Sequence, residues 1–378
     1  MTRALVSIGA VETRLLVLDG DDTPLEAHVE RPDAPPAAGS RALGRVVDVD
    51  RDLDAVFVDL GLDRPGLLPR KAGRDLGAGD AVAVEVTRAP PPGKGARLTR
   101  AKGAATGDGP VPRWLERRDI VADILRDTAP ETITAQGEGA RAAIRGRVPA
   151  LAERVTAHTG AQPLFDTLGC DRVFPDLLAP DVPVAGGGSL RIEPVTSLTA
   201  IDVDTGGREP LEAGKAAARE VARQIRLRAL AGLLVVDFPT IEAREQRRRV
   251  TDTLAGALAG DRLAPEISAM RASGLVEITR QRERAPMHEV LGERCGVDGG
   301  GWLPGPGTVA LEALRALERA AHAHPAGQPR LTAAPAVVAV LTGAMAAARR
   351  ASETRLGRPI QLTPDPARER KDVDARAD

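Results

Sequence analysis

The chain has 378 residues and carries 52 Lys and Arg against 53 Asp and Glu, which gives a formal net charge of −1. This length allows two or three domains with sizeable cores, and the balanced charge argues against binding of nucleic acid over the whole surface. Tyrosine is absent, and Phe and Trp number only 4 and 2, so the cores must be aliphatic and side chains that stack on bases are scarce.

The cysteines and the apolar runs of the sequence indicate the cellular compartment of the protein. The two cysteines, Cys170 and Cys295, lie far apart and predict a reducing environment rather than a disulfide framework. No leader-like apolar region opens the sequence, and no apolar run is long enough to span a bilayer. We therefore expect a cytoplasmic protein with no membrane partner.

Short strands dominate the first hundred residues. Three are predicted at 4–8, 13–18 and 25–29, and a Pro/Ala-rich linker follows at 31–39. A second group at 44–49, 55–61 and 81–86 has the spacing of a small barrel. Phe57 lies in this group, either as a base-stacking residue or as a core phenylalanine.

Helices and turns are expected next. A Gly/Ala-rich bridge at 101–112 leads to a predicted helix at 113–126, and another helix is predicted at 148–158. Glycines 186–188 then turn the chain into a strand that leads to Thr199.

A strand–helix–strand unit follows. The apolar runs Leu198–Val203 and Leu233–Phe238 predict two buried strands, and apolar residues at helical spacing between Glu209 and Leu230 predict a helix that joins them. Strands joined in this way are parallel, with a right-handed crossover.

Two acidic residues stand at the ends of these strands. If the strands are neighbours, Asp202 and Asp237 lie about 5 Å apart at the carboxyl edge of the sheet, where ligands of open α/β sheets bind. Asp204 points to the same face as Asp202 while the strand persists. Such oxygen donors suit magnesium, with manganese as an alternative. The competing interpretation is that these acids simply meet solvent.

The remaining elements are a charged helix at 242–258, strands at 266–268 and 275–278, and alanine-rich helices at 309–321 and 336–351. The charged tail from Asp365 is expected to be disordered. Three local basic runs stand out from the near-neutral chain, although such a run is also typical of a solvated face. They lie at 224–228, 244–249 and 280–284.

Four motifs in order resemble the ribonuclease E/G family. They are Leu198–Gly206, Glu220–Arg228, Gly232–Phe238 and Gly274–Arg282. The resemblance implies that the acids at the positions of Asp202 and Asp237 hold a magnesium ion that activates water for phosphodiester hydrolysis. The family usually has asparagine at the position of Asp204.

The resemblance also implies the architecture. It is an α/β multidomain fold in which a ribonuclease H-like subdomain contains an inserted OB-fold barrel, followed by a DNase I-like catalytic subdomain and a small helical C-terminal domain. The expected boundaries are 1–38 with 113–185, 39–112, 186–293, a zinc-link region at 294–302, 303–364, and the tail at 365–378.

Further site residues follow from the same resemblance. Phe57 and Lys94 are expected to contact RNA together with Arg97 and Gln281, although Lys94 could equally be an exposed loop residue. The family often has a second aromatic residue where this chain has Leu67. Arg280 and Arg282 are expected to leave the sheet near the metal and to clamp a phosphate or stabilise developing charge.

The sequence departs from the family at two further places. We find no equivalent of the insertion that forms the sensor for an RNA 5′-monophosphate. The family's Cys-x-x-Cys zinc link is reduced to Cys295 and Asp298, so these two are the remaining candidates for zinc ligands and zinc is not expected. A homodimer is compatible with the resemblance, but the zinc link no longer predicts one.

We therefore expect a magnesium-dependent endoribonuclease that cuts single-stranded RNA and leaves 5′-phosphate and 3′-hydroxyl ends. Two alternatives remain. One is an RNA-binding protein with reduced or no catalysis, and the other is a magnesium-dependent phosphatase, which would not need the barrel.

Overall fold

The computed structural model describes residues 2–32, 34–103, 109–160, 162–295 and 301–378. The chain divides into two compact units, each built from separate stretches of sequence. Unit 1 contains residues 1–32, 124–180 and 287–378, and unit 2 contains residues 33–123 and 181–286. Among the described residues, the helices are all too short or too polar to cross a membrane.

Unit 1 is built on a five-stranded sheet with the order β11-β10-β1-β2-β3. Strands β1, β2 and β3 are antiparallel, whereas β10 is parallel to β1 and β11 to β10. The strands are β1 (Arg3–Ile8), β2 (Thr13–Leu18), β3 (Pro24–Glu30), β10 (Thr132–Gln136) and β11 (Val155–His158). The three strands predicted at the start of the chain are thus confirmed.

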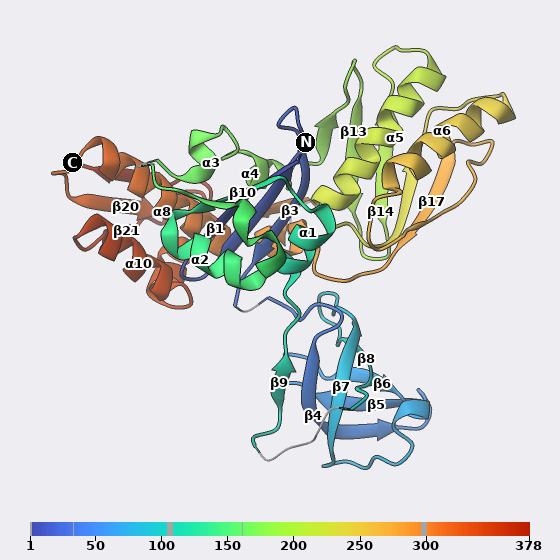
Figure 1. Ribbon diagram of the computed structural model, residues 1–378, viewed down its shortest axis with the longest axis horizontal. Helices are drawn as coiled ribbons and strands as arrows, with labels where there is room; N and C mark the ends of the chain where they lie inside the picture. Colours follow the sequence, from blue (N-terminus) through green and yellow to red (C-terminus); the bar gives the residue numbers. More distant parts are fainter. Residues whose placement is uncertain (1, 33, 104–108, 161, 296–300) are drawn as a thin grey trace. The chain divides into compact units, whose positions relative to one another are not determined.

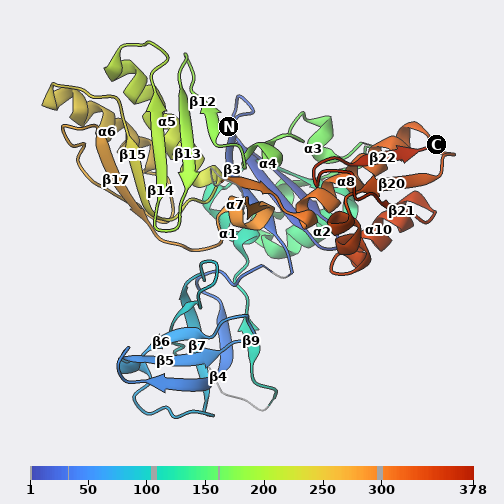
Figure 2. The same cartoon turned by 180° about the vertical axis from the view of Figure 1, so that it is seen from behind.

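Short helices accompany this sheet (Figures 1 and 2). They are α1 (Ile120–Thr128), α2 (Gly137–Arg147), η2 (Pro149–Arg154), α3 (Leu164–Thr167) and α4 (Val173–Asp176). The helix predicted at 148–158 is wrong. Pro149 starts only a 3-10 turn, and the β-branched Val155 and Thr156 pair with β10 instead.

The last part of unit 1 is a small α/β layer. Its three-stranded sheet has the order β21-β20-β22, and the chain also forms a two-stranded ribbon of β18 and β19. The elements are α7 (Met287–Leu291), β18 (Gly292–Arg294), β19 (Trp302–Pro304), α8 (Pro306–Ala323), β20 (Pro329–Ala333), α9 (Pro335–Thr342), α10 (Ala346–Leu356), β21 (Gln361–Pro364) and β22 (Asp374–Ala377).

Three predictions for this region need correction. The small C-terminal domain is α/β rather than helical, because β20, β21 and β22 form a sheet beside its helices. The second alanine-rich helix is interrupted at Gly343, which separates α9 from α10. The tail expected to be disordered forms β22, because its backbone pairs with β20 and Ala377 is buried. Backbone pairing with a buried strand ordered the charged segment despite its composition.

The first part of unit 2 is a closed five-stranded barrel. The order β5-β6-β8-β7-β4 closes through pairing of β4 with β5, and β9 adds to β4. The elements are β4 (Arg41–Asp50), β5 (Ala55–Asp59), β6 (Gly66–Pro69), the 3-10 turn η1 (Arg70–Ala72), β7 (Ala81–Arg88), β8 (Arg97–Arg100) and β9 (Arg113–Glu116). The predicted helix is wrong over 113–116, where Trp114 packs on the barrel core.

The second part of unit 2 is a six-stranded sheet with the order β12-β13-β14-β15-β17-β16. Its strands are β12 (Asp181–Pro183), β13 (Ser189–Pro194), β14 (Thr199–Asp204), β15 (Gly232–Asp237), β16 (Glu266–Ile267) and β17 (Leu275–Arg280). The helices α5 (Pro210–Leu227) and α6 (Arg244–Leu258) match the two helices predicted for this region.

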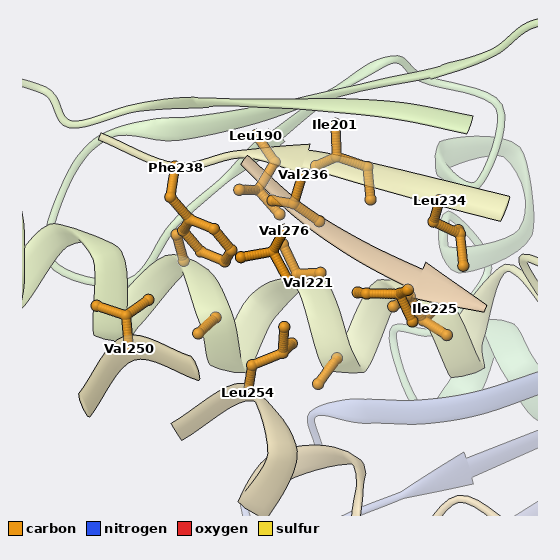
Figure 3. Packing of buried hydrophobic residues seen from close by; sticks show 14 of the residues in the cluster. Leu190, Ile201, Val221, Ile225, Leu234, Val236, Phe238, Val250, Leu254 and Val276 are labelled. Atoms are coloured by element: carbon orange, nitrogen blue, oxygen red, sulfur yellow. The ribbon is translucent and has the colours of Figure 1, made fainter. Parts of the chain in front are cut away.

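These two helices cover one face of the sheet. Figure 3 shows aliphatic side chains of the strands packed against α5 and α6. They include Ile201, Leu234 and Val276 from the sheet and Val221 and Leu254 from the helices. The mixed α/β class and the closed barrel are therefore confirmed, whereas the ribonuclease H-like and DNase I-like assignments stay predictions.

Candidate active site

Asp202 and Asp237 are direct neighbours across two strands. β14 and β15 run parallel, and their register pairs Asp202 with Asp237. Since neighbouring strands lie about 4.8 Å apart, the juxtaposition predicted for the two residues is correct. Their catalytic role stays a prediction.

Alternation along the strands sets the direction of these side chains. Ile201 and Val236 are buried under the helices, so the next residue of each strand faces the opposite side. Both aspartates are exposed there. Among the described residues, neither carboxylate has a hydrogen-bond or ion-pair partner, so the pair is open to a ligand from solvent.

Asp204 reaches the same face but has a local task. β14 continues to Asp204, and its Oδ1 accepts a hydrogen bond of 2.9 Å from the backbone N–H of Gly206. Within the described parts of the chain, no three His, Cys, Asp or Glu side chains gather closely enough to hold a metal ion together. The two paired aspartates are therefore the core of the candidate site.

Gly274 supports the strand end that carries Asp237. Its φ is +96°, and a Cβ there would lie 2.2 Å from the carbonyl oxygen of Phe238. The backbone N–H of Phe238 donates to the Gly274 carbonyl at 3.2 Å. Only glycine permits this approach without strain.

The expected position of Arg280 is wrong. β17 is antiparallel to β15, so Leu275 lies beside Asp237 and Arg280 lies beside Gly232 at the other end of the strand. The Arg280 side chain is 4% exposed. Its guanidinium donates through Nε to Oδ2 of Asp261 at 2.7 Å and through Nη1 to the Leu230 carbonyl at 3.0 Å.

This buried ion pair is structural. Burial by itself raises the pKa of Asp261, but hydrogen bonds and charge from Arg280 outweigh burial and lower that pKa below its ordinary value. Arg282 is also buried and donates to the Pro90 carbonyl at 3.1 Å. Gln281 is exposed, and its side chain donates to the Thr87 carbonyl at 3.2 Å. The run 280–282 thus leaves the sheet at the end away from the two aspartates.

The sequence interpretation missed Arg191. This residue pairs in register with Asp202 from the neighbouring strand β13. Its neighbours Leu190 and Ile192 are buried, so alternation places Arg191 on the same open face as the acids. The alternation was visible in the sequence, but the partner strand was not.

The expected RNA-binding residues of the barrel form a separate group. Phe57 pairs with Leu67, and Leu67 pairs with Arg97, so the three lie in one row across β5, β6 and β8. Phe57 is half-buried, whereas its neighbours Val56 and Val58 belong to the core. The core interpretation of Phe57 is therefore wrong.

Lys94 is exposed in the turn before this row. Next to it, a Cβ on Gly95 would lie 1.8 Å from the Pro65 carbonyl oxygen, so glycine is needed for the backbone to pass there. Cys295 is a partly exposed free thiol, and its expected companion Asp298 lies outside the described residues.

Comparison with known proteins agrees with these motifs. Residues 114–283 match the Ribonuclease E/G family. The chain is 30% identical to Ribonuclease G of Escherichia coli K12 over 228 residues. This alignment covers 58% of this chain and 47% of that protein.

Two further relatives support the same assignment. Identity is 32% over 199 residues with Ribonuclease G of Haemophilus influenzae, covering 50% of this chain and 40% of that protein. Identity is 36% over 151 residues with Ribonuclease E of Nostoc sp., and that alignment covers 38% of this chain and 22% of that protein. The match spans about half the length of the ribonuclease G relatives. These similarities support a relationship to the ribonuclease E/G family over residues 114–283.

Proposed function

We propose that this protein is a magnesium-dependent endoribonuclease that cuts single-stranded RNA and leaves 5′-phosphate and 3′-hydroxyl ends. The observation that carries the proposal is the pair Asp202 and Asp237, which lie in register on neighbouring parallel strands and are exposed. Similarity to proteins named Ribonuclease G and Ribonuclease E supports the choice of RNA as substrate.

The residues fit a magnesium ion. Magnesium takes oxygen ligands, retains several waters and is commonly held by one or two carboxylates together with phosphate oxygens of the substrate. Two exposed carboxylates that have no partner among the described residues meet this requirement, and a third protein ligand is not needed. Asp202 and Asp237 would hold the ion, which would act as a Lewis acid toward the phosphodiester and orient a water.

The protein's own groups then have separate tasks. Asp202 and Asp237 would fix the position of the ion on the open sheet face, and the ion would in turn attract the phosphodiester to it. Asp204 adds negative charge beside them while it holds the turn at Gly206. In the proposed reaction a water oxygen bonds to phosphorus, the bond from phosphorus to the 3′ oxygen breaks, and the leaving oxygen takes a proton.

The barrel supplies single-strand binding in this proposal. The partly exposed ring of Phe57 can stack on a base, and the exposed side chains of Lys94 and Arg97 can contact phosphates. Leu67 completes the row with an apolar rather than a stacking surface. Because phosphate contacts dominate such binding, affinity should fall steeply with salt.

We also propose that cleavage does not depend on a 5′-monophosphate. Residues 101–112 alone connect β8 to β9, and this connection is too short to contain a domain-sized insertion. The test compares RNAs of the same sequence with 5′-monophosphate and 5′-hydroxyl ends. Equal cleavage rates are expected, and a many-fold preference for the monophosphate would overturn this part of the proposal.

The second candidate is an RNA-binding protein with little or no catalysis. It is favoured by the position of Arg280, which is committed to Asp261 rather than available to a phosphate. This candidate predicts binding of single-stranded RNA without cutting.

The deciding experiment measures cleavage of a fluorescent A/U-rich single-stranded RNA with and without magnesium. We compare the wild type with Asp237→Asn and Asp202→Asn, and with Asp252→Asn as a control that changes an exposed aspartate on α6. Magnesium-dependent cutting that only the first two variants lose supports the enzyme. Binding without cutting in all four proteins supports the second candidate. End-group mapping of the products tests the proposed 5′-phosphate.

A further inference from the structure

Four charged residues form one row across the open sheet of unit 2. The register pairs Asp181 with Arg191, Arg191 with Asp202, and Asp202 with Asp237, from β12 through to β15. Side chains paired across strands lie on the same face, with Cβ atoms about 5 Å apart. Arg191 therefore stands one strand from Asp202 and two strands from Asp237.

Two carboxylates hold the guanidinium of Arg191. Nε donates to Oε1 of Glu193 at 2.9 Å, and Nη1 donates to Oδ1 of Asp181 at 3.0 Å. Hydrogen bonding to Glu193 and the charge of Asp181 raise the pKa of Arg191 further above its ordinary value, so the side chain stays charged wherever the protein is folded. The Arg191 side chain is 51% exposed despite these bonds.

The guanidinium retains donors for a ligand. Arginine has five N–H donors in a planar fork, and among the described residues Arg191 uses two of them. The remaining donors suit a phosphate group, which guanidinium binds through two parallel hydrogen bonds. Asp181 and Glu193 fix the fork in advance, which reduces the conformational entropy lost on binding.

The open sheet face around the acid pair is negatively charged, and the guanidinium of Arg191 is a positive group beside it. Asp202, Asp204 and Asp237 are all exposed on the same side, and together they repel an approaching polyanion. Arg191 is the cation in the same register row as the acid pair. Its guanidinium bonds to β12 and to Glu193, away from Asp202, so it lies beside the acid pair rather than between the two acids.

We propose that Arg191 binds the phosphate that adjoins the scissile phosphate of the RNA, and that Asp181 and Glu193 orient it for this contact. The proposal rests on the proposed function, because it assumes that RNA lies across the Asp202–Asp237 pair. Arg191 is then a substrate-positioning residue that takes over the phosphate contact predicted for Arg280.

The test measures equilibrium binding of an A/U-rich single-stranded RNA in the Asp237→Asn background, which is expected not to cut. Each phosphate contact contributes a slope of about −0.7 to log K against log salt. Loss of one contact in Arg191→Gln should therefore weaken binding about fourfold at 0.15 M salt and about eightfold at 0.05 M. Arg191→Lys keeps a positive charge and should retain most of the slope.

Two controls separate a direct contact from side effects. Arg376→Gln removes another exposed strand arginine, which bonds through Nε to Asp374, two residues away, in unit 1, and it should leave RNA binding unchanged. Arg191→Gln combined with Asp181→Asn and Glu193→Gln removes the carboxylates that the single variant uncovers. A direct contact predicts that this triple variant keeps the reduced slope.

Cleavage kinetics in the wild-type background give the second readout. Arg191→Gln should raise KM about fourfold at 0.15 M salt and leave kcat nearly unchanged. An unchanged salt slope, or a slope restored in the triple variant, would overturn the proposal while wild-type cleavage would still support the function. If the wild type does not cut but the slope falls as expected, the function fails and the contact stands.

Discussion

The two aspartates of the site should destabilise the sheet that carries them. Asp202 and Asp237 are paired in register, and among the described residues neither carboxylate makes an ion pair, since the guanidinium of Arg191 bonds to Asp181 and Glu193. Two unit charges about 5 Å apart in water repel each other by roughly 0.8 kcal/mol. Replacing Asp237 with asparagine removes this repulsion and keeps the shape of the side chain.

Hydrogen exchange of the amides in β14 and β15 measures the effect locally. Without divalent cations and at low salt, these amides should exchange about fourfold more slowly in Asp237→Asn than in the wild type. Magnesium at ten times its dissociation constant should then protect the wild type by a further 1.4 kcal/mol or so, about tenfold. The variant should gain much less protection.

The control is Asp252→Asn on α6, where the carboxylate faces Arg248 at 3.5 Å rather than another acid. In Asp252→Asn, the amides of β14 and β15 should exchange as they do in the wild type, with and without magnesium. The reasoning fails if Asp237→Asn exchanges as fast as the wild type without magnesium, or if magnesium protects both proteins equally.

Three further predictions concern the scaffold. Gly274→Ala should reduce cleavage and destabilise unit 2 by roughly 1–3 kcal/mol, because its Cβ would meet the Phe238 carbonyl behind Asp237. Gly256→Ala, where a Cβ meets open space on α6, should instead stabilise unit 2 by about 0.5–1 kcal/mol. Urea unfolding measures both changes. Arg280→Met should cost about 3–5 kcal/mol because it strands the buried Asp261, while the fraction that remains folded keeps its kcat. Burial opposes ionisation of Glu12, but nearby arginines outweigh it and hold its pKa at about 2 instead of 4.5, so its contribution to stability is complete above pH 4.5 and is lost as pH falls toward 2; Glu12→Gln should remove that acid-dependent loss in calorimetry.

Local sequence patterns were sufficient to predict the centre of the site. An apolar run, a helix of suitable length and a second apolar run allow little except a parallel pair, and each run ends in an acid. The register that faces Asp202 with Asp237 then follows from burial, because a slip by one residue would turn Val236 toward solvent and Asp237 into the core.

The surroundings of the site depend on partners that lie far away in the sequence. Nothing in the run ending at Arg280 shows whether its strand is parallel or antiparallel to β15, and this direction alone decides which end lies near Asp237. The same limit applies to Trp114, which packs on the barrel rather than in a helix. Arg191 was missed because its partner strand was unknown.

The antiparallel direction of β17 also explains how an exposed pair of like charges can be maintained. One end of β17 is fixed by the buried pair of Arg280 and Asp261, and its other end pairs Leu275 with Asp237. Removing one partner of such a buried pair costs about 3–5 kcal/mol because the other charge is left buried and unpaired, so any shift of β17 that separates Arg280 from Asp261 is disfavoured. The arginine expected to act in chemistry thus stabilises the strand whose far end holds Asp237 in place.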